Sequence, residues 1–148
     1  MTSQMTYLHP DHIFDGDVLR KGYVAVKSGS ITGILDTLPT GSTAQTLQGT
    51  LSPGYLDLQV NGGGDALLNN TPTLQAMQTM AAAHRRFGTV GIMPTIITDA
   101  PEVLEHAADA ALQAHALRGI LGLHIEGPHL SLARRGTHAA QFIRPLDA

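Results

Sequence analysis

Alternating apolar and polar positions predict three strands between residues 55 and 126. Residues 55–61 alternate, residues 89–98 form a β-branched run, and residues 120–126 alternate again. Two stretches with apolar residues at helical spacing, 72–87 and 100–118, separate these strands. The order strand, helix, strand, helix, strand predicts right-handed βαβ units and therefore a parallel sheet of the α/β class.

Capping signals mark where the two helices are expected to begin. Thr71 followed by Pro72 is typical of an N-cap and a first-turn proline, and Gly88 is expected to end that helix. Asp99 with Glu102 resembles a capping box for the second helix. The expected buried face of the second helix consists of Val103, Leu104, Ala107, Ala108, Ala111 and Leu112.

The third predicted strand ends on an acidic residue, Glu126. Gly127-Pro128 follows at once and is expected to stop the strand, because proline cannot donate to a sheet ladder. Alternation places His124 and Glu126 on one face, and in an α/β barrel the inward side chains at carboxyl strand ends carry the chemistry. Two plainer interpretations remain open: Glu126 caps the following turn, and His124 is a hydrogen-bonded core residue. The opposite face, expected to pack into a core, carries Leu121, Leu123 and Ile125.

Residues 12–47 show a short, strand-like pattern. Residues 22–27 and 30–36 alternate around Ser28-Gly29, which predicts a hairpin. Residues 38–48 are rich in Thr, Gly and Ser and predict a loop with room for one short strand. So few strands cannot bury two faces alone, so residues 1–51 are expected to be part of a small β domain that precedes the α/β part at 52–148.

Two segments beside the strand ends are candidates for ligand binding. Residues 61–64 read Asn-Gly-Gly-Gly, a loop that can bring backbone N–H groups close to a ligand, although a plain glycine turn fits equally well. Residues 130–148 lack periodicity and are expected to form a βα loop over the same end of the sheet, where ligand-binding residues collect.

Composition excludes several classes of protein and site. The chain has 148 residues, of which 43% are hydrophobic and 14% charged, which is typical of a globular protein with a substantial core. Its net charge is −3 and its basic residues are scattered, so no nucleic-acid partner is expected. The lack of cysteine excludes disulfides and thiolate metal ligands. Neither a signal peptide nor about 18 uninterrupted apolar residues is present, so a cytoplasmic protein without a membrane partner is expected.

Three stretches together resemble the opening of the N-acetylglucosamine-6-phosphate deacetylases, members of the amidohydrolase superfamily. They are residues 53–62 (PGYLDLQVNG), 88–98 (GTVGIMPTIIT) and 121–128 (LGLHIEGP), the last with Gly136-Thr137-His138. Their order and spacing, after a β-rich lead, make the combined resemblance specific over essentially the whole chain. Residues His129 and Ala139-Ala140 depart from the family, which usually has an aromatic residue and an Asn-Pro pair there.

The resemblance implies a metal-dependent (β/α)8 barrel beside a small β-sandwich built from both ends of the chain. Residues 1–51 would be the amino-terminal part of that sandwich, and residues 52–148 would be the first three β/α units of the barrel. The implied reaction converts N-acetylglucosamine 6-phosphate, a phosphorylated amino sugar, into glucosamine 6-phosphate and acetate in amino-sugar catabolism. The full-length family member is implied to be a homodimer.

The same resemblance assigns roles to four residues. Glu126 would be the first ligand of one divalent metal ion, expected to be zinc, since a carboxylate suits that ion. Gln59 and Asn61 stand where many amidohydrolases have a His-x-His pair, and amides are poor zinc ligands, so one metal is expected, with both amides ordering water or substrate. His138 would contact the sugar.

The length of the chain, 148 residues, leaves two alternatives to a complete enzyme open. A complete barrel takes about 250 residues, and the family's two histidine ligands and aspartate acid/base lie on later strands, so no catalytic residue is assigned within this chain. The chain alone is therefore expected to be inactive, because catalytic zinc takes three protein ligands. One alternative is a truncated, non-catalytic fragment that pairs its open edges with a partner or second copy. Another is an amidohydrolase of a different amide, against which Gln59 and Asn61 count.

Overall fold

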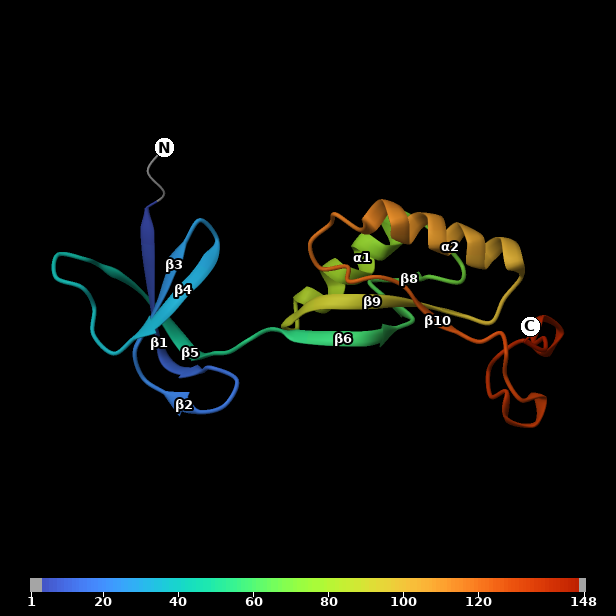
Figure 1. The fold of residues 1–148 in the computed structure, drawn as a ribbon, viewed down its shortest axis with the longest axis horizontal. Helices are drawn as coiled ribbons and strands as arrows, with labels where there is room; N and C mark the ends of the chain where they lie inside the picture. Colours follow the sequence, from blue (N-terminus) through green and yellow to red (C-terminus); the bar gives the residue numbers. More distant parts are fainter. Residues whose placement is uncertain (1–3, 147–148) are drawn as a thin grey trace. The chain divides into compact units, whose positions relative to one another are not determined.

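The computed structural model describes residues 4–146. The chain divides into two compact units, with the boundary along the sequence between Pro53 and Gly54. Figure 1 shows a sheet in each unit, with the α-helices of the described residues in the second. This arrangement confirms the predicted α/β class. None of the helices in residues 4–146 combines the length and the apolar character needed to cross a membrane.

The first unit is a five-stranded sheet. Its strands are β1 (Met5–Phe14), β2 (Leu19–Arg20), β3 (Tyr23–Lys27), β4 (Ser30–Leu35) and β5 (Ala44–Leu51). Strands β2, β1, β3 and β4 lie in that order, and β5 pairs in parallel with β1. The predicted hairpin is confirmed as β3–β4, with Lys27 opposite Ser30 and positive φ angles at the two turn residues between them.

Two strands of the first unit differ from the sequence-based expectation. β1 begins at Met5, within a segment for which no strand was expected, and β5 has eight residues where a loop with one short strand was expected. Neither strand alternates cleanly, because both contain polar residues on both faces. Pairing of β1 with β3 on one side and β5 on the other supplies the ladder hydrogen bonds that local pattern did not indicate.

The second unit contains the three predicted parallel strands. β6 (Tyr55–Val60), β9 (Thr89–Ile97) and β10 (His124–Glu126) form a sheet in the order β10–β9–β6. Val60 pairs with Pro94 and Glu126 with Ile97, so the carboxyl ends of all three strands lie at one edge. A small ribbon of β7 (Gly62–Gly63) and β8 (Ala66–Leu67) follows β6. β10 is shorter than expected, although Ile120 still bridges to Ile92.

The two helices exist as predicted but begin at other caps. α1 (Leu74–Arg85) is capped by Thr73, whose hydroxyl accepts from the Ala76 backbone, so the expected cap at Thr71 is wrong by two residues. α2 (Pro101–Ala114) begins with proline in its first turn, after Ala100. The Asp99 carboxylate accepts from the adjacent Ala100 N–H and from Asn69 Nδ2, and α2 has no side-chain cap bond, so the expected capping box does not form.

The core of the second unit lies between the sheet and the two helices (Figure 1). Its central residues are Val60, Leu68, Met77, Met80, Ile92, Ile96, Ala107, Ala110 and Ala114. Leu112, expected on the buried face of α2, is 76% exposed. At about 100° per residue it lies about 140° around the helix from Ala107, whereas Ala110 and Ala114 lie close to that direction. Small residues therefore form the contact face of α2.

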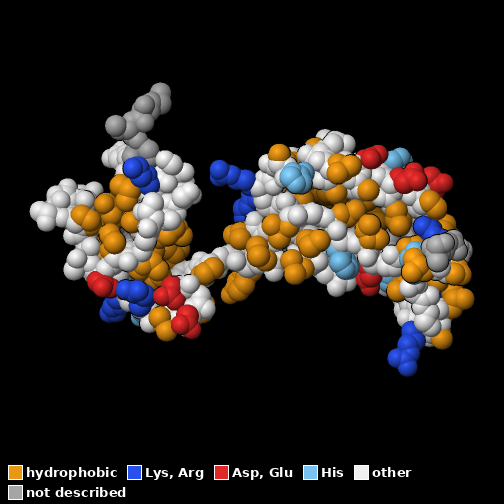
Figure 2. Space-filling view, viewed as in Figure 1, with side chains coloured by type: hydrophobic (Ala, Val, Ile, Leu, Met, Phe, Trp, Pro, Cys, Tyr) orange, Lys and Arg blue, Asp and Glu red, His pale blue; other side chains and the backbone are white. Residues whose placement is uncertain are grey.

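Apolar side chains also remain on the surface of the second unit (Figure 2). Leu121 and Ile125 are 51% and 50% exposed, so of the three residues expected to face a core only Leu123 packs against it. Leu56 and Leu58 on β6 are 62% and 59% exposed, whereas Val60 on the same face is buried. The helices therefore cover only part of the sheet.

The segment after β10 is a loop, as predicted. It contains two short 3-10 turns, Leu132–Arg134 and Ala140–Phe142, and no other regular element up to residue 146. The last two residues of the expected loop, 147 and 148, lie outside the described residues.

Candidate functional site

Glu126, the last residue of β10, lies at the carboxyl edge of the parallel sheet, with its side chain 35% exposed. Both carboxylate oxygens have partners. Oε2 accepts a hydrogen bond of 2.8 Å from Gln59 Nε2, and Oε1 lies 3.3 Å from His138 Nε2. These contacts do not support the interpretation of Glu126 as a cap of the following turn, because its carboxylate contacts side chains from two other segments.

Gln59 reaches Glu126 from β6, the strand on the other side of β9. It is the penultimate residue of β6, and β9 lies between β6 and β10. The hydrogen bond between Gln59 and Glu126 therefore crosses the end of the central strand. The side-chain amide of Gln59 does not titrate and always carries N–H donors. Gln59 can therefore hold the Glu126 carboxylate in place without neutralising its negative charge.

His138 brings the loop after β10 back to the strand ends. Its ring is buried, with 8% of the side chain exposed, although its neighbours from Ser131 to Thr137 are exposed. Nδ1 lies 2.8 Å from Thr98 Oγ1, and Nε2 faces Glu126. Arg135 holds the loop backbone, because its guanidinium donates to the His138 carbonyl at 2.8 Å.

Thr98 is a site residue that the sequence analysis did not single out. It follows β9 directly, is 3% exposed, and contacts both His138 and the Glu126 backbone oxygen, the latter at 3.3 Å. Its only sequence signal is a hydroxyl at the end of an apolar strand. The contacts of that hydroxyl depend on the path of the loop after β10. That path cannot be predicted from the sequence, because the loop has no periodic pattern.

The end of β9 is held by the Asn69 side chain. Asn69 Nδ2 donates to the Ile97 carbonyl at 3.1 Å and to Asp99 Oδ2 at 2.8 Å, while the Ile97 N–H donates to Asn69 Oδ1 at 3.1 Å. β6 pairs with β9 no further than Pro94. On the side of β6, the amide of Asn69 therefore takes the place of a neighbouring strand at the residue just before Thr98.

The other two predicted residues lie apart from this network. Asn61 follows β6 and is exposed, and no side-chain hydrogen bond links it to Glu126 within residues 4–146. His124 lies on β10, two residues before Glu126, and its buried Nδ1 has no hydrogen-bond partner in the described part of the chain. The interpretation of His124 as a satisfied core histidine is therefore not supported at that atom.

The donor set suits one metal ligand but does not complete a metal site. Glu126 offers a partly exposed carboxylate beside an imidazole, which is suitable chemistry for a divalent ion. Across residues 4–146, however, no three His, Cys, Asp or Glu side chains are grouped closely enough to hold a metal ion. Since catalytic zinc takes three protein ligands, these residues alone supply at most part of a site.

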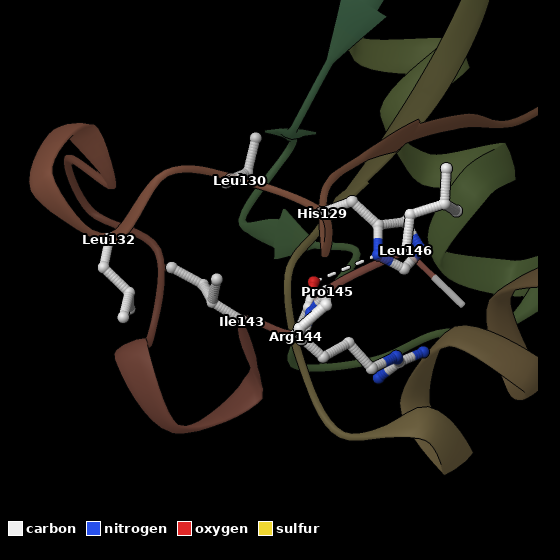
Figure 3. A pocket seen from close by; sticks show the side chains of 7 residues that line it. All are labelled: His129, Leu130, Leu132, Ile143, Arg144, Pro145 and Leu146. Atoms are coloured by element: carbon white, nitrogen blue, oxygen red, sulfur yellow. Dashed lines mark hydrogen bonds between the residues drawn. The ribbon is translucent and has the colours of Figure 1, made fainter. Parts of the chain in front are cut away.

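A separate pocket lies within the loop itself (Figure 3). Its lining consists of His129, Leu130, Leu132, Ile143, Arg144, Pro145 and Leu146. His129 Nδ1 lies 3.0 Å from the Arg144 carbonyl and joins the two ends of the loop. The lining is mostly apolar and includes none of Gln59, Thr98, Glu126 and His138, so the strand-end cluster remains the better candidate for chemistry.

The chain is similar to known sugar-phosphate deacetylases. It is 42% identical over 136 residues to N-acetylgalactosamine-6-phosphate deacetylase of Shewanella sp. (strain ANA-3), a match that covers 87% of this chain and 34% of that protein. It is 33% identical over 136 residues to N-acetylglucosamine-6-phosphate deacetylase of Haemophilus influenzae, covering 88% of this chain and 35% of the relative. No protein-family model matches the chain.

Solved structures agree with the sequence comparison. The crystal structure of N-acetylglucosamine-6-phosphate deacetylase from Pasteurella multocida superimposes with a TM-score of 0.90 at 28% identity, covering 97% of this chain and 40% of that one. The chain thus spans about a third of the length of the curated relatives it matches.

Proposed function

Because the chain is related over most of its length to the N-acetylglucosamine-6-phosphate deacetylases, we propose that it forms part of a hydrolase that removes the acetyl group from a 6-phosphorylated N-acetylhexosamine. The products from N-acetylglucosamine 6-phosphate would be glucosamine 6-phosphate and acetate. The observation that carries this proposal is the meeting of Gln59, Glu126 and His138, from three separate segments, at the carboxyl edge of a parallel sheet. That edge is where α/β barrel enzymes hold their catalytic groups.

The proposed architecture is a barrel of which residues 52–148 contribute the first three β/α units, with residues 1–51 as part of a small β-sandwich. Three features support it. The strands β6, β9 and β10 are parallel and adjacent in space, and they follow one another along the chain with only the small β7–β8 ribbon and the two helices between them. β6 and β10 each pair with β9 alone among the described strands of their sheet, which leaves both edges open for further strands. Apolar residues on β6 and β10 remain exposed.

Glu126 is proposed as the first ligand of one divalent metal ion, expected to be zinc. Such an ion, when bound, lowers the pKa of a coordinated water and polarises a carbonyl group. Gln59 would hold the carboxylate in place through its 2.8 Å hydrogen bond. A neutral amide is a poor zinc ligand, so Gln59 and Asn61 would order water or substrate and leave a single metal.

His138 is proposed to contact the sugar. The buried ring lies beside Glu126 on a loop that follows the third barrel strand, so a substrate held at Glu126 would meet its Nε2 atom. Burial fixes the ring and keeps water from that side of the site. The remaining ligands and the acid/base group would come from other segments of a longer chain.

A second candidate substrate is N-acetylgalactosamine 6-phosphate. The relative that acts on it by name shares 42% identity with this chain, compared with 33% for the N-acetylglucosamine-6-phosphate deacetylase of H. influenzae. The two sugars differ only in the configuration of the C4 hydroxyl. The reacting acetamide is the same in both, so the proposed roles of Glu126 and His138 apply to either.

Acetate release tests the proposal. A longer chain that contains residues 1–148 is expected to release acetate from at least one of the two phosphosugars, and the ratio of kcat/KM values identifies the preferred one. The 148-residue chain alone is expected to release none. If the longer chain also released none from either sugar, the deacetylase proposal would be wrong, and a non-catalytic chain or an amidohydrolase of a different amide would remain.

A further inference from the structure

The glycine-rich segment after β6 packs against α1. Residues 62–67 form the hairpin of β7 and β8, and both of its turn residues have positive φ, as a tight hairpin turn requires. A Cβ on Gly63 would lie 2.9 Å from Nε2 of His84, and one on Gly64 would lie 3.1 Å from Cγ2 of Thr79. Both contacts are with side chains of α1, so the glycines allow the hairpin to approach the helix closely.

His84 of α1 binds the backbone of this hairpin. Its Nε2 lies 3.0 Å from the carbonyl oxygen of Gly62 in a partly buried contact. A carbonyl oxygen can only accept, so Nε2 is the donor and carries a hydrogen. The neutral ring with its hydrogen on Nε2 and the charged ring both meet this requirement, so the contact does not depend on the charge of the ring.

Asn61 stands directly before this anchor. Its carbonyl oxygen accepts from the Leu68 N–H at 3.1 Å, and the next carbonyl, that of Gly62, accepts from His84. Leu68 is fully buried in the core of the second unit, so one hydrogen bond comes from the core and the other from α1. The backbone of Asn61 is therefore held in place although the residue is exposed.

The anchor acts where the sheet no longer fixes the chain. Val60 is the last residue of β6 that pairs with β9, so the ladder ends just before Asn61. We propose that His84 is a positioning residue that holds the backbone of Asn61 at the end of β6 and thereby presents its amide to the substrate. This role rests on the proposed function, in which Asn61 orders water or substrate. An amide that is already in place binds more tightly, because less ordering remains to be done on binding.

Amide hydrogen exchange of the 148-residue chain tests the anchor itself. His84→Leu removes the donor to Gly62, so the Leu68 amide, which binds the Asn61 carbonyl, should exchange about 3–10-fold faster, as the loss of one hydrogen bond gives. His84→Gln keeps an N–H donor of similar reach and should restore the parent rate. His106→Leu, at an exposed position of α2, is the matched control and should leave the rate unchanged. An unchanged rate in His84→Leu, or an equal acceleration in His106→Leu, would overturn the proposal.

An alanine at Gly63 tests the contact of the ring with the hairpin independently. The φ angle of Gly63 lies outside the positive region, so the main obstacle to a Cβ is the His84 ring. Gly63→Ala should therefore lower the urea midpoint less in a His84→Ala chain than in the parent. Gly33→Ala, where the space is open, is the control and should cause the same shift in both chains. Equal shifts for Gly63→Ala in the two chains would contradict the packing on which the anchor depends.

Kinetics of a longer chain that deacetylates connect the anchor with the reaction. His84→Leu should raise KM about 3–10-fold with little change in kcat, because the Asn61 amide is correctly placed in a smaller fraction of molecules and apparent affinity falls by that fraction. His84→Gln should restore KM. An unchanged KM in folded His84→Leu would remove the positioning role.

A double substitution shows whether His84 acts through Asn61. In an Asn61→Ala chain, the amide that His84 positions is absent, so His84→Leu should raise KM no further. An equal rise with and without the Asn61 amide would overturn the proposal. A longer chain that never releases acetate would contradict the deacetylase function instead, and it would leave the hydrogen-exchange result standing.

Discussion

At the scale of single residues, Glu126 is held by groups far from it in the sequence. Gln59 lies 67 residues before it and His138 lies 12 residues after it. Each of the two carboxylate oxygens has one of these partners, so the orientation of the carboxylate is set before any ligand arrives. Fixed orientation of this kind is what supporting hydrogen bonds provide at metal and catalytic centres.

Replacing Gln59 tests that support. Gln59→Leu keeps a side chain of similar volume and removes the donor to Glu126, so the zinc affinity of a longer, metal-binding chain should fall about 10–100-fold. Competition with a chelator measures that affinity. Gln113→Leu, at an exposed position of α2, is the matched control and should leave zinc affinity unchanged. Equal losses in the two variants would show that Gln59 does not act through Glu126.

Gly127 should be intolerant of any side chain. Its φ of +90° is strained for other residues, and a Cβ there would collide with Thr98 Oγ1. Gly127→Ala is therefore expected to lower the free energy of unfolding by at least about 1–3 kcal/mol, as measured by urea titration. Gly136→Ala is the control, since φ is also positive there but the space is open. A smaller loss for Gly127→Ala than for Gly136→Ala would contradict the proposed crowding at Thr98.

The sequence pointed to the residues of the site more readily than to their contacts. Glu126 was indicated by its place at a strand end, and Gln59 and His138 by resemblance to the deacetylases. Thr98 was missed because its importance depends on where an aperiodic loop returns to the sheet. Asn61 was expected beside Gln59, but it lies past the end of β6 and is exposed. Alternation along a strand does not extend into the turn that follows it.

At the scale of elements, the end of β9 is held on its β6 side by a side chain, because β6 pairs with β9 no further than Pro94 whereas β10 pairs with it up to Ile97. Asn69, in the segment after β8, makes three hydrogen bonds there, two of them to the backbone of Ile97. Because Thr98 and Asp99 follow immediately, this clamp fixes the point at which β9 gives way to the loop before α2. It thereby connects the β8–α1 segment with the candidate site.

Removing the clamp should destabilise the second unit. Asn69→Ala leaves the N–H and C=O of Ile97 without these partners, so the free energy of unfolding should fall by about 2–3 kcal/mol. Asn70→Ala removes the same side chain from the next, exposed position and should change stability by less than about 0.5 kcal/mol. Urea unfolding followed by circular dichroism compares the two. Similar stabilities would mean that the Asn69 contacts do not hold the strand end.

The elements that were predicted well are those with strong local patterns. The alternating and β-branched runs became β6, β9 and β10, and the β3–β4 hairpin followed its two-residue turn. The helix caps were misplaced because Thr71 and Thr73 carry equal cap propensity, and only the structure shows that Thr73 binds the Ala76 N–H. The extents of β1 and β5 were underestimated because the two strands pair in parallel with each other and are far apart in the sequence.

At the scale of the whole molecule, the chain has a sheet edge equipped for chemistry but an incomplete set of ligands. No three metal-ligating side chains converge within residues 4–146, and the sheet that carries Glu126 has apolar surface on β6 and β10. Both observations agree with a chain that spans about a third of its curated relatives. We therefore propose that the remaining ligands lie on segments that would complete the sheet.

The 148-residue chain should accordingly bind zinc poorly. A single carboxylate supported by an amide does not provide the three ligands of a catalytic site. Titration with zinc, followed by mass spectrometry of the intact chain, should show no tightly bound ion at equimolar metal. One zinc ion retained through dialysis would show that the described residues form a more complete site than their geometry indicates.

Replacing Glu126 in a longer chain is the decisive test of its proposed role as a metal ligand. Acetate release from N-acetylglucosamine 6-phosphate and N-acetylgalactosamine 6-phosphate should be measured for that chain and for Glu126→Gln, which keeps the shape of the side chain and removes its charge. We predict a loss of more than about 100-fold in kcat/KM on the preferred sugar, which is larger than the loss that removal of an outer-shell partner gives. Undiminished acetate release by Glu126→Gln would contradict it.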